Sequence, residues 1–237
     1  MEVIVVDDFS NDIEMSRALD RLSAHALIDL NVLRLSQNSG PSVARNTGWA
    51  AATQEYVAFL DADDVWAPRK LELQFPLMEE DRTLSMSGHR MEVRDESGGS
   101  TDQSLVPLHA KSFTSTQLLF RNRLSTPTVI LRRDIPFRFN PERRYSEDYE
   151  LWLRVALMDG RFKFLDVPLA FSFKAFYGES GLSSELRRME KGQTSVYRTL
   201  FREHAFSTAM FITLLLWGKV RFVRRIAITL LRKALQR

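Results

Sequence analysis

The sequence predicts an α/β fold in which helices flank a parallel or mixed sheet. Apolar runs and amphipathic segments alternate through the first 60 residues in the order strand, helix, strand, helix, strand, a pattern typical of doubly wound sheets. Two of these runs end in carboxylates, because Asp7 and Asp8 follow residues 3–6 and Asp61 follows residues 56–60. Ligands of such sheets bind at the carboxyl ends of the strands. The sequence therefore predicts a site at the edge where these acids gather.

Periodicity and turn signals place the other elements. Ser42 is a candidate N-cap for the helix that ends at residue 52, and Ser146 for the helix that begins at residue 147. Residues 95–104 and 177–184 are rich in glycine and serine and predict surface loops. Helices are expected at about 12–25, 42–52, 69–77, 113–121 and 147–158, and strands at 3–6, 31–35, 56–60, 83–94, 127–132, 162–167 and 169–174.

Charge is distributed unevenly along the 237 residues. The chain has 33 basic and 30 acidic residues, but no acid follows Glu203, whereas seven basic residues do. The high isoelectric point therefore belongs to the C-terminal tail, and the globular part is mildly acidic. This distribution argues against a nucleic-acid-binding domain, and the absence of cysteine excludes disulfides and thiolate metal sites.

Three acids follow the apolar run at residues 56–60. Asp61 and Asp63 lie two residues apart, so in extended chain their side chains project to the same side, whereas Asp64 points elsewhere. Two carboxylates without nearby histidine or cysteine suit Mg²⁺ or Mn²⁺, which completes its shell with water and substrate phosphates. Arg45, at the start of the preceding helix, could add a second positive charge. The alternative is an ordinary acidic loop, since an Asp-x-Asp sequence alone is common.

Four segments, taken together and in order, resemble the family 2 inverting glycosyltransferases of the GT-A fold. They are EVIVVDDFSND at residues 2–12, GPSVARNTG at 40–48, YVAFLDADD with the following helix at 56–74, and EDYELWLR at 147–154. The resemblance covers about residues 2–185. It implies a GT-A mixed sheet flanked by helices, and transfer of a sugar from a nucleotide-sugar, typically a UDP-sugar, to a hydroxyl acceptor with inversion.

The resemblance also implies roles for the acids at the sheet edge. Asp8 would bind the nucleotide base, with Asp7 supporting the turn, although both also suit a structural Asx-turn that closes a strand. Asp61 would lie near the ribose and diphosphate and beside the metal, and Asp63 would bind the metal directly. Arg45 would approach the nucleotide, or else form a structural salt bridge.

Asp148 would be the general base that takes the proton of the acceptor hydroxyl. A single displacement with inversion needs one such carboxylate on the acceptor side. The alternative for Glu147 and Asp148 is structural, since acids favour the first turn of a helix. Trp152 is expected in the core rather than beneath a sugar.

One departure from the family pattern concerns the start of the domain. The family opens with a strand and a helix that precede the segment matching residues 2–12, and this chain starts at Met1. We therefore expect a nucleotide-binding half that lacks one strand. A competing hypothesis is a non-catalytic nucleotide-sugar-binding or scaffold protein, inactive for lack of that strand.

The tail predicts association with a membrane surface. Residues 1–190 are expected to form the glycosyltransferase domain and 191–237 a helical tail. From residue 219 onward, apolar residues line one helical face and Arg221, Arg224, Arg225 and Arg232 line the other, a pattern typical of helices lying on anionic membranes. The alternative is a helix packed on the core or a partner. The expected location is the cytoplasmic face of the membrane, with a saccharide or lipid-linked acceptor in bacterial surface-polysaccharide or glycolipid synthesis.

Overall fold

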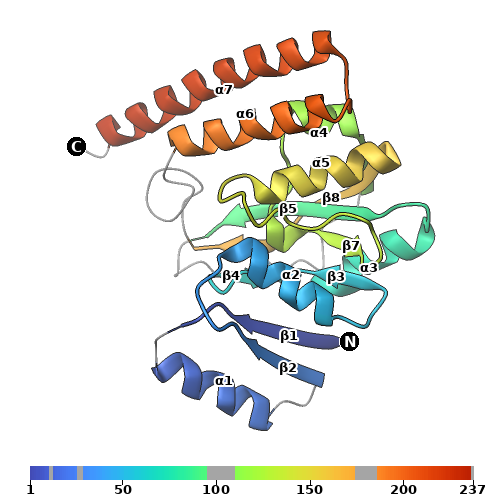
Figure 1. The fold of residues 1–237 in the computed structure, drawn as a ribbon, viewed down its shortest axis with the longest axis vertical. Coiled ribbons are helices and arrows are strands. Elements are labelled where there is room, and N and C mark those ends of the chain that lie inside the picture. Colours follow the sequence, from blue (N-terminus) through green and yellow to red (C-terminus); the bar gives the residue numbers. More distant parts are fainter. Residues whose placement is uncertain (11–12, 26–28, 95–109, 174–185, 236–237) are drawn as a thin grey trace.

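The computed structural model describes the chain apart from residues 11–12, 26–28, 95–109, 174–185 and 236–237 (Figure 1). The helices are α1 (Ile13–His25), α2 (Pro41–Ala51), α3 (Lys70–Glu80), α4 (Ser115–Phe120), α5 (Glu147–Asp159), α6 (Leu186–Arg202) and α7 (Thr208–Leu235). The strands are β1 (Glu2–Asp7), β2 (Asp29–Arg34), β3 (Tyr56–Ala58), β4 (Asp64–Trp66), β5 (Met86–Val93), β6 (Ala110–Thr114), β7 (Ile130–Arg132) and β8 (Arg161–Ser172).

The strands form two sheets. β1 and β2 are parallel and make a two-stranded sheet, while the other six form a mixed sheet in the order β3-β7-β5-β8-β4, with β6 also on β8. The sequence predicts one doubly wound sheet, but among the described strands β1 hydrogen-bonds only to β2. The expectation that this chain lacks the first strand and helix of the family stays a prediction.

Strand β8 differs from its prediction. Two strands are expected on either side of Pro168, whereas one strand runs from Arg161 to Ser172. It is parallel to β5 on one edge and antiparallel to β6 and β4 on the other. Proline cannot donate a ladder hydrogen bond, and the β5–β8 register shifts at Arg90, opposite Pro168. The irregularity at Arg90 therefore lets the strand continue through the proline.

The short strands β4 and β6 are not predicted from the sequence. β4 comes directly after the Asp-x-Asp segment, and β6 directly precedes α4. Helix α2 also begins differently, since Gly40 is its N-cap, with a φ of 85°, and Pro41 occupies its first turn. Ser42 therefore lies inside the helix rather than capping it.

An aromatic cluster packs α2 against α5 and the end of β3. Ring centroids of Trp49 and Phe59 are 5.5 Å apart, those of Phe59 and Phe139 5.1 Å, and those of Phe139 and Trp152 5.8 Å. All four side chains are buried, and Trp152 lies in the core as predicted. This packing holds the segments that carry Arg45, Asp61 and Asp148 in one region of the molecule.

Helices α6 and α7 pack antiparallel to each other and form the outer layer over α4 and α5 (Figure 1). Val196, Tyr197, Leu200 and Leu214 from these helices belong to the main hydrophobic core. The expected domain boundary at residue 190 falls inside α6. No helix among the described residues is long and apolar enough to cross a membrane.

Candidate active site

Arg45 connects two of the predicted acidic segments. Its Nη2 lies 2.8 Å from Asp61 Oδ1 and 3.0 Å from Asp61 Oδ2, and its Nη1 lies 3.0 Å from Glu147 Oε1. The guanidinium also lies over the Phe139 ring, 5.3 Å from its centroid. Burial opposes the charged form of Arg45, but Asp61 and Glu147 outweigh it and raise the arginine pKa. Arg45 is thus a charged bridge between residues far apart in sequence.

The acidic pair begins helix α5 at a constrained turn. Ser146, its N-cap, has a φ of 61° in the left-handed region, and its side chain makes no cap hydrogen bond. Gly192 of α6 lies against this turn, where an added Cβ would meet the Tyr145 carbonyl oxygen at 2.9 Å and Ser146 Oγ at 3.2 Å. The close approach of Gly192 therefore leaves no room for a side chain beside the turn that holds Glu147 and Asp148.

Asp148 has a strongly raised pKa. Burial and the neighbouring Glu147 charge raise the pKa of Asp148 to about 7, while the Tyr149 backbone N–H, 2.7 Å from Oδ1, and Arg45 oppose the rise. Asp61 adds further negative charge. A carboxyl with a pKa near neutrality is poised to accept a proton at working pH, and such shifts are concentrated at functional sites.

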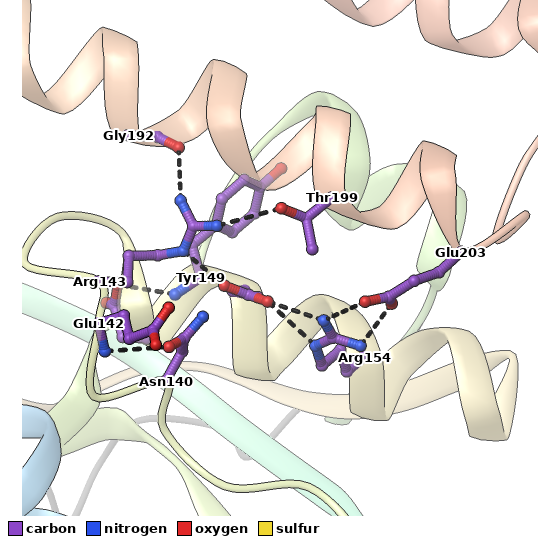
Figure 2. A network of polar contacts seen from close by, with 10 residues as sticks. Asn140, Glu142, Arg143, Tyr149, Arg154, Gly192, Thr199 and Glu203 are labelled. Atoms are coloured by element: carbon purple, nitrogen blue, oxygen red, sulfur yellow. Dashed lines mark hydrogen bonds and ion pairs between the residues drawn. The ribbon is translucent and has the colours of Figure 1, made fainter.

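A polar network fixes the rest of α5 to α6 (Figure 2). Glu150, whose side chain is 3% exposed, accepts hydrogen bonds from Arg143 Nε at 2.5 Å and Arg154 Nη2 at 2.8 Å. Arg143 also donates to the Gly192 carbonyl and Thr199 Oγ1, and Arg154 to Glu203. This network anchors the helix that carries Asp148 without placing a further group at the site.

The first acidic turn binds the loop before α2. Asp7 Oδ1 accepts a hydrogen bond from the Ser10 backbone N–H at 2.9 Å, and hydrogen bonds from Ser10 hold the pKa of Asp7 below its usual value. The two carboxylate oxygens of Asp8 accept from the backbone N–H groups of Ser39 and Gly40, at 2.7 and 2.8 Å. Asp7 thus closes a local turn, as the structural alternative expects, whereas Asp8 joins its turn to a distant loop rather than closing an Asx-turn. Each oxygen keeps a lone pair for a ligand.

The Asp-x-Asp segment forms a turn between β3 and β4. The Asp64 backbone N–H donates to the Asp61 carbonyl at 3.1 Å, and Asp64 enters β4, paired with Ser172. The Asp63 side chain is exposed, whereas both oxygens of Asp61 accept from Arg45. Among the described residues, no group of three or more histidine, cysteine, aspartate or glutamate side chains is arranged to hold a metal ion. This arrangement fits Mg²⁺ or Mn²⁺ held by one or two carboxylates together with substrate phosphates, rather than an all-protein cage.

The structure brings Arg45, Asp61 and Asp148 together, with Glu147 as an additional partner of Arg45. Asp63 lies in the adjoining turn. Asp8 binds the backbone of Ser39 and Gly40, which lead into α2, whereas the Asp7 side chain binds Ser10 within its own turn. The Arg45–Glu147 contact links residues 102 positions apart. No local pattern in the sequence signals such a contact, so sequence reasoning did not find it.

Proteins of known description are similar to this chain in sequence. A Bacillus subtilis glycosyltransferase provisionally assigned to teichuronic acid biosynthesis is 34% identical over 157 residues, covering 64% of this chain and 59% of the relative. A second relative is the Escherichia coli UDP-Glc:α-D-GlcNAc-diphosphoundecaprenol β-1,3-glucosyltransferase WfgD. It is 29% identical over 154 residues, which cover 65% of this chain and 57% of the relative. The chain thus spans less than two thirds of either relative.

Solved structures show the same fold. Staphylococcus aureus TarS residues 1–349 in complex with UDP-GlcNAc matches 94% of this chain and 63% of that chain, with a TM-score of 0.67 and 22% identity. GalNAc-T7 with UDP, GalNAc and Mn²⁺ matches 97% of this chain and 51% of that chain, with a TM-score of 0.56 and 16% identity. The predicted GT-A mixed sheet flanked by helices is confirmed.

The sequence model of the family described as "Glycosyl transferase family 2" matches residues 1–145 of this chain. These residues contain the first acidic turn, Arg45 and the Asp-x-Asp turn. That match covers more than half of the chain, and it agrees with both the relatives and the fold. The chain belongs to glycosyl transferase family 2.

Proposed function

We propose that the protein transfers a sugar from a nucleotide-sugar, a UDP-sugar by preference, to a hydroxyl acceptor with inversion. The observation that carries the proposal is the joining of the Asp-x-Asp turn to the acidic start of α5 through Arg45. This arrangement sets a charged arginine and an acidic turn, suited to a diphosphate and its cation, beside a carboxyl with a pKa of about 7.

Asp148 acts as the general base. Its carboxylate takes the proton of the acceptor hydroxyl as the oxygen bonds to the anomeric carbon, and the bond to the nucleoside diphosphate breaks on the opposite face. One positioned base suffices for this displacement, and general-base catalysis typically contributes 10²–10⁴-fold to the rate. Glu147 keeps Arg45 in place and helps raise the pKa of Asp148.

Asp63, with Asp61 beside it, would hold Mg²⁺ or Mn²⁺ together with the diphosphate. A cation bound there supplies positive charge to the departing diphosphate. Arg45 orients Asp61 and adds its own charge to this side of the site. Asp8 lies at the other end, where its remaining lone pairs can accept from a base while the Ser39 and Gly40 N–H groups fix the carboxylate.

The acceptor we propose is a saccharide carried on a membrane lipid, as the printed name of the E. coli relative states for that protein. The basic C-terminal tail supports this location, because it attracts an anionic cytoplasmic leaflet. The proposed setting is the synthesis of a bacterial surface polysaccharide or glycolipid at the inner face of the cell membrane.

The test measures donor binding and turnover separately. UDP with Mn²⁺ at 100 times its Kd should stabilise the protein by about 2.7 kcal/mol, a rise in Tm of roughly 5–10 °C. Asp63→Ala should remove the Mn²⁺-dependent part of this shift. Asp148→Asn should keep the shift but lower UDP release from UDP-sugars at least 100-fold.

Exposed Asp134→Asn serves as the charge-matched control and should change neither the Tm shift nor turnover. Sugar transfer at the unaltered rate by both site variants would refute the mechanism. Ligand binding without turnover in the unaltered protein would favour the non-catalytic alternative instead.

A further inference from the structure

Helix α7 presents an apolar stripe to solvent. Ile212, Leu216, Val220 and Val223 are 52%, 64%, 59% and 65% exposed and follow one another at intervals of three or four residues. Residues spaced in this way share one face of a helix. An uninterrupted apolar row on an outermost helix is not accounted for by the packing of this chain and marks an interaction surface.

Polar contacts of Trp217 and Arg221 fix the rotation of the helix. Arg221 Nη1 donates to the Phe120 carbonyl at 3.0 Å, and its Nη2 to the Tyr197 hydroxyl at 3.2 Å. Trp217 Nε1 also donates to the Phe120 carbonyl, at 2.9 Å. Rolling α7 to bury the stripe would break these bonds. These hydrogen bonds therefore hold α7 in the rotation that exposes the stripe to solvent.

The inner face of α7 is closely packed as well. Leu214 is fully buried in the main core, and an added Cβ at Gly218 would come within 3.1 Å of Glu190 Oε1 on α6. Arg221 thus belongs to the inner side, although the sequence pattern places it on a solvated basic face. The stripe is flanked instead by the exposed residues Lys219 and Arg224.

We infer that this stripe, defined as Ile212, Leu216, Val220 and Val223, is the face through which the protein docks on an anionic lipid surface. The inference rests on the proposed membrane location and assigns the residues that make the contact. Apolar side chains enter the acyl boundary while the flanking cations meet the headgroups. The absence of any acid after Glu203 favours anionic lipid over a basic or neutral partner.

The geometry is that of an interfacial helix. Trp217, 42% exposed and held by its hydrogen bond to Phe120, lies beside the stripe, and tryptophan favours the membrane–water interface. The stripe runs along the length of the helix, so we expect α7 to lie in the plane of the membrane surface. α7 lies at the outer edge of the molecule, with α6 between it and α5 (Figure 1).

The experiment measures sedimentation of the full chain with vesicles. Binding should require phosphatidylglycerol in phosphatidylcholine vesicles and weaken as salt is added. Leu216→Gln together with Val223→Gln should lower the partition coefficient roughly 100-fold, because each buried aliphatic side chain contributes about tenfold. The matched control is Met158→Gln, which replaces a 46% exposed apolar residue of α5 and should leave binding unchanged.

Four further results separate the inference from the proposed reaction. The double variant should retain UDP release with a soluble acceptor, because the stripe lies outside the catalytic site. Vesicle binding by the double variant equal to that of the unaltered protein would overturn the assigned face but not the reaction. A lack of vesicle binding by the unaltered protein, or a stripe-dependent dimer seen by light scattering without vesicles, would overturn lipid docking itself.

Discussion

At the scale of single residues, Asp148 couples activity to stability. Its pKa is raised to about 7 from an ordinary value near 4, chiefly by burial and by the charge of Glu147. The folded state therefore binds a proton more tightly than the unfolded chain does between about pH 4 and 7. Stability contributed by the protonated carboxyl is present at low pH and is lost as the pH rises through this window.

Asp148→Asn should therefore stabilise the protein at pH 8 while abolishing transfer. The amide carries no charge to oppose Glu147, and a gain on the order of 1–2 kcal/mol is expected. Thermal unfolding of the variant and the unaltered protein at pH 5 and pH 8 measures this stabilisation. The stabilisation should be smaller at pH 5, where Asp148 of the unaltered protein is protonated. An equal effect at both pH values would show that Asp148 is not raised in pKa.

The pH dependence of turnover follows from the same group. A general base must be deprotonated to act, so kcat should rise with pH and level off above about 7. Glu147→Gln removes a neighbouring negative charge and should move the inflection to lower pH. A profile flat between pH 5 and 8 in the unaltered protein would exclude Asp148 as the base.

Phe9 carries backbone strain beside the first acidic turn. Its φ is 64°, in the left-handed region, and its side chain is 48% exposed. Because non-glycine residues reach this region at a cost of about 1–3 kcal/mol, Phe9→Gly should relieve strain and raise the unfolding free energy by roughly 1 kcal/mol. Chemical denaturation measures the change in unfolding free energy. The control is Phe173→Gly, at another exposed phenylalanine, which should not raise the unfolding free energy.

At the scale of elements, the attachment of α5 to α6 depends on buried charge. Glu150 is nearly inaccessible and is held by Arg143 and Arg154. Arg143→Met should cost about 3–5 kcal/mol, because it leaves a buried carboxylate short of a partner. Adding Glu150→Gln should restore part of the lost unfolding free energy, because it removes the buried charge. Urea unfolding of the single and double variants measures both changes.

The control for this network is Arg69→Met, which removes an exposed ion pair with Glu72. Exposed pairs contribute at most about 1 kcal/mol, so its effect should be small. If Arg143→Met were as mild as this control, the network of Figure 2 would not anchor the helix.

Elements with strong local signals could be predicted from the sequence, whereas those defined by distant partners could not. The run of β-branched residues in β1 predicts a strand, and the acidic residues at the start of α5 predict the beginning of a helix. β4 has three residues, and only its pairing with β8 makes it a strand. The same distinction holds at the site, where Asp148 and the Asp-x-Asp turn follow from motifs. The Arg45 bridge to Glu147 exists only through tertiary packing.

At the scale of the whole molecule, the tail is part of the core. Val196, Tyr197, Leu200 and Leu214 pack in the main cluster with residues of α4 and α5. A chain ending at residue 185 should therefore lose cooperative unfolding and bind the dye ANS, since it exposes apolar surface that the helices cover. Near-ultraviolet circular dichroism and calorimetry check this outcome. Unfolding with an unchanged Tm would instead support a separable domain ending near residue 190.

The position of β8 late in the chain has a consequence for folding during synthesis on the ribosome. β4 and β6 hydrogen-bond to no described strand except β8, whose last residue is Ser172. At a synthesis rate of about 5–20 residues per second, β4 waits roughly 5–20 s for its partner to be made. During that interval the nascent chain carries open strand edges, which are templates for aggregation. Newly made chains should therefore depend on cotranslational chaperones until the sheet closes.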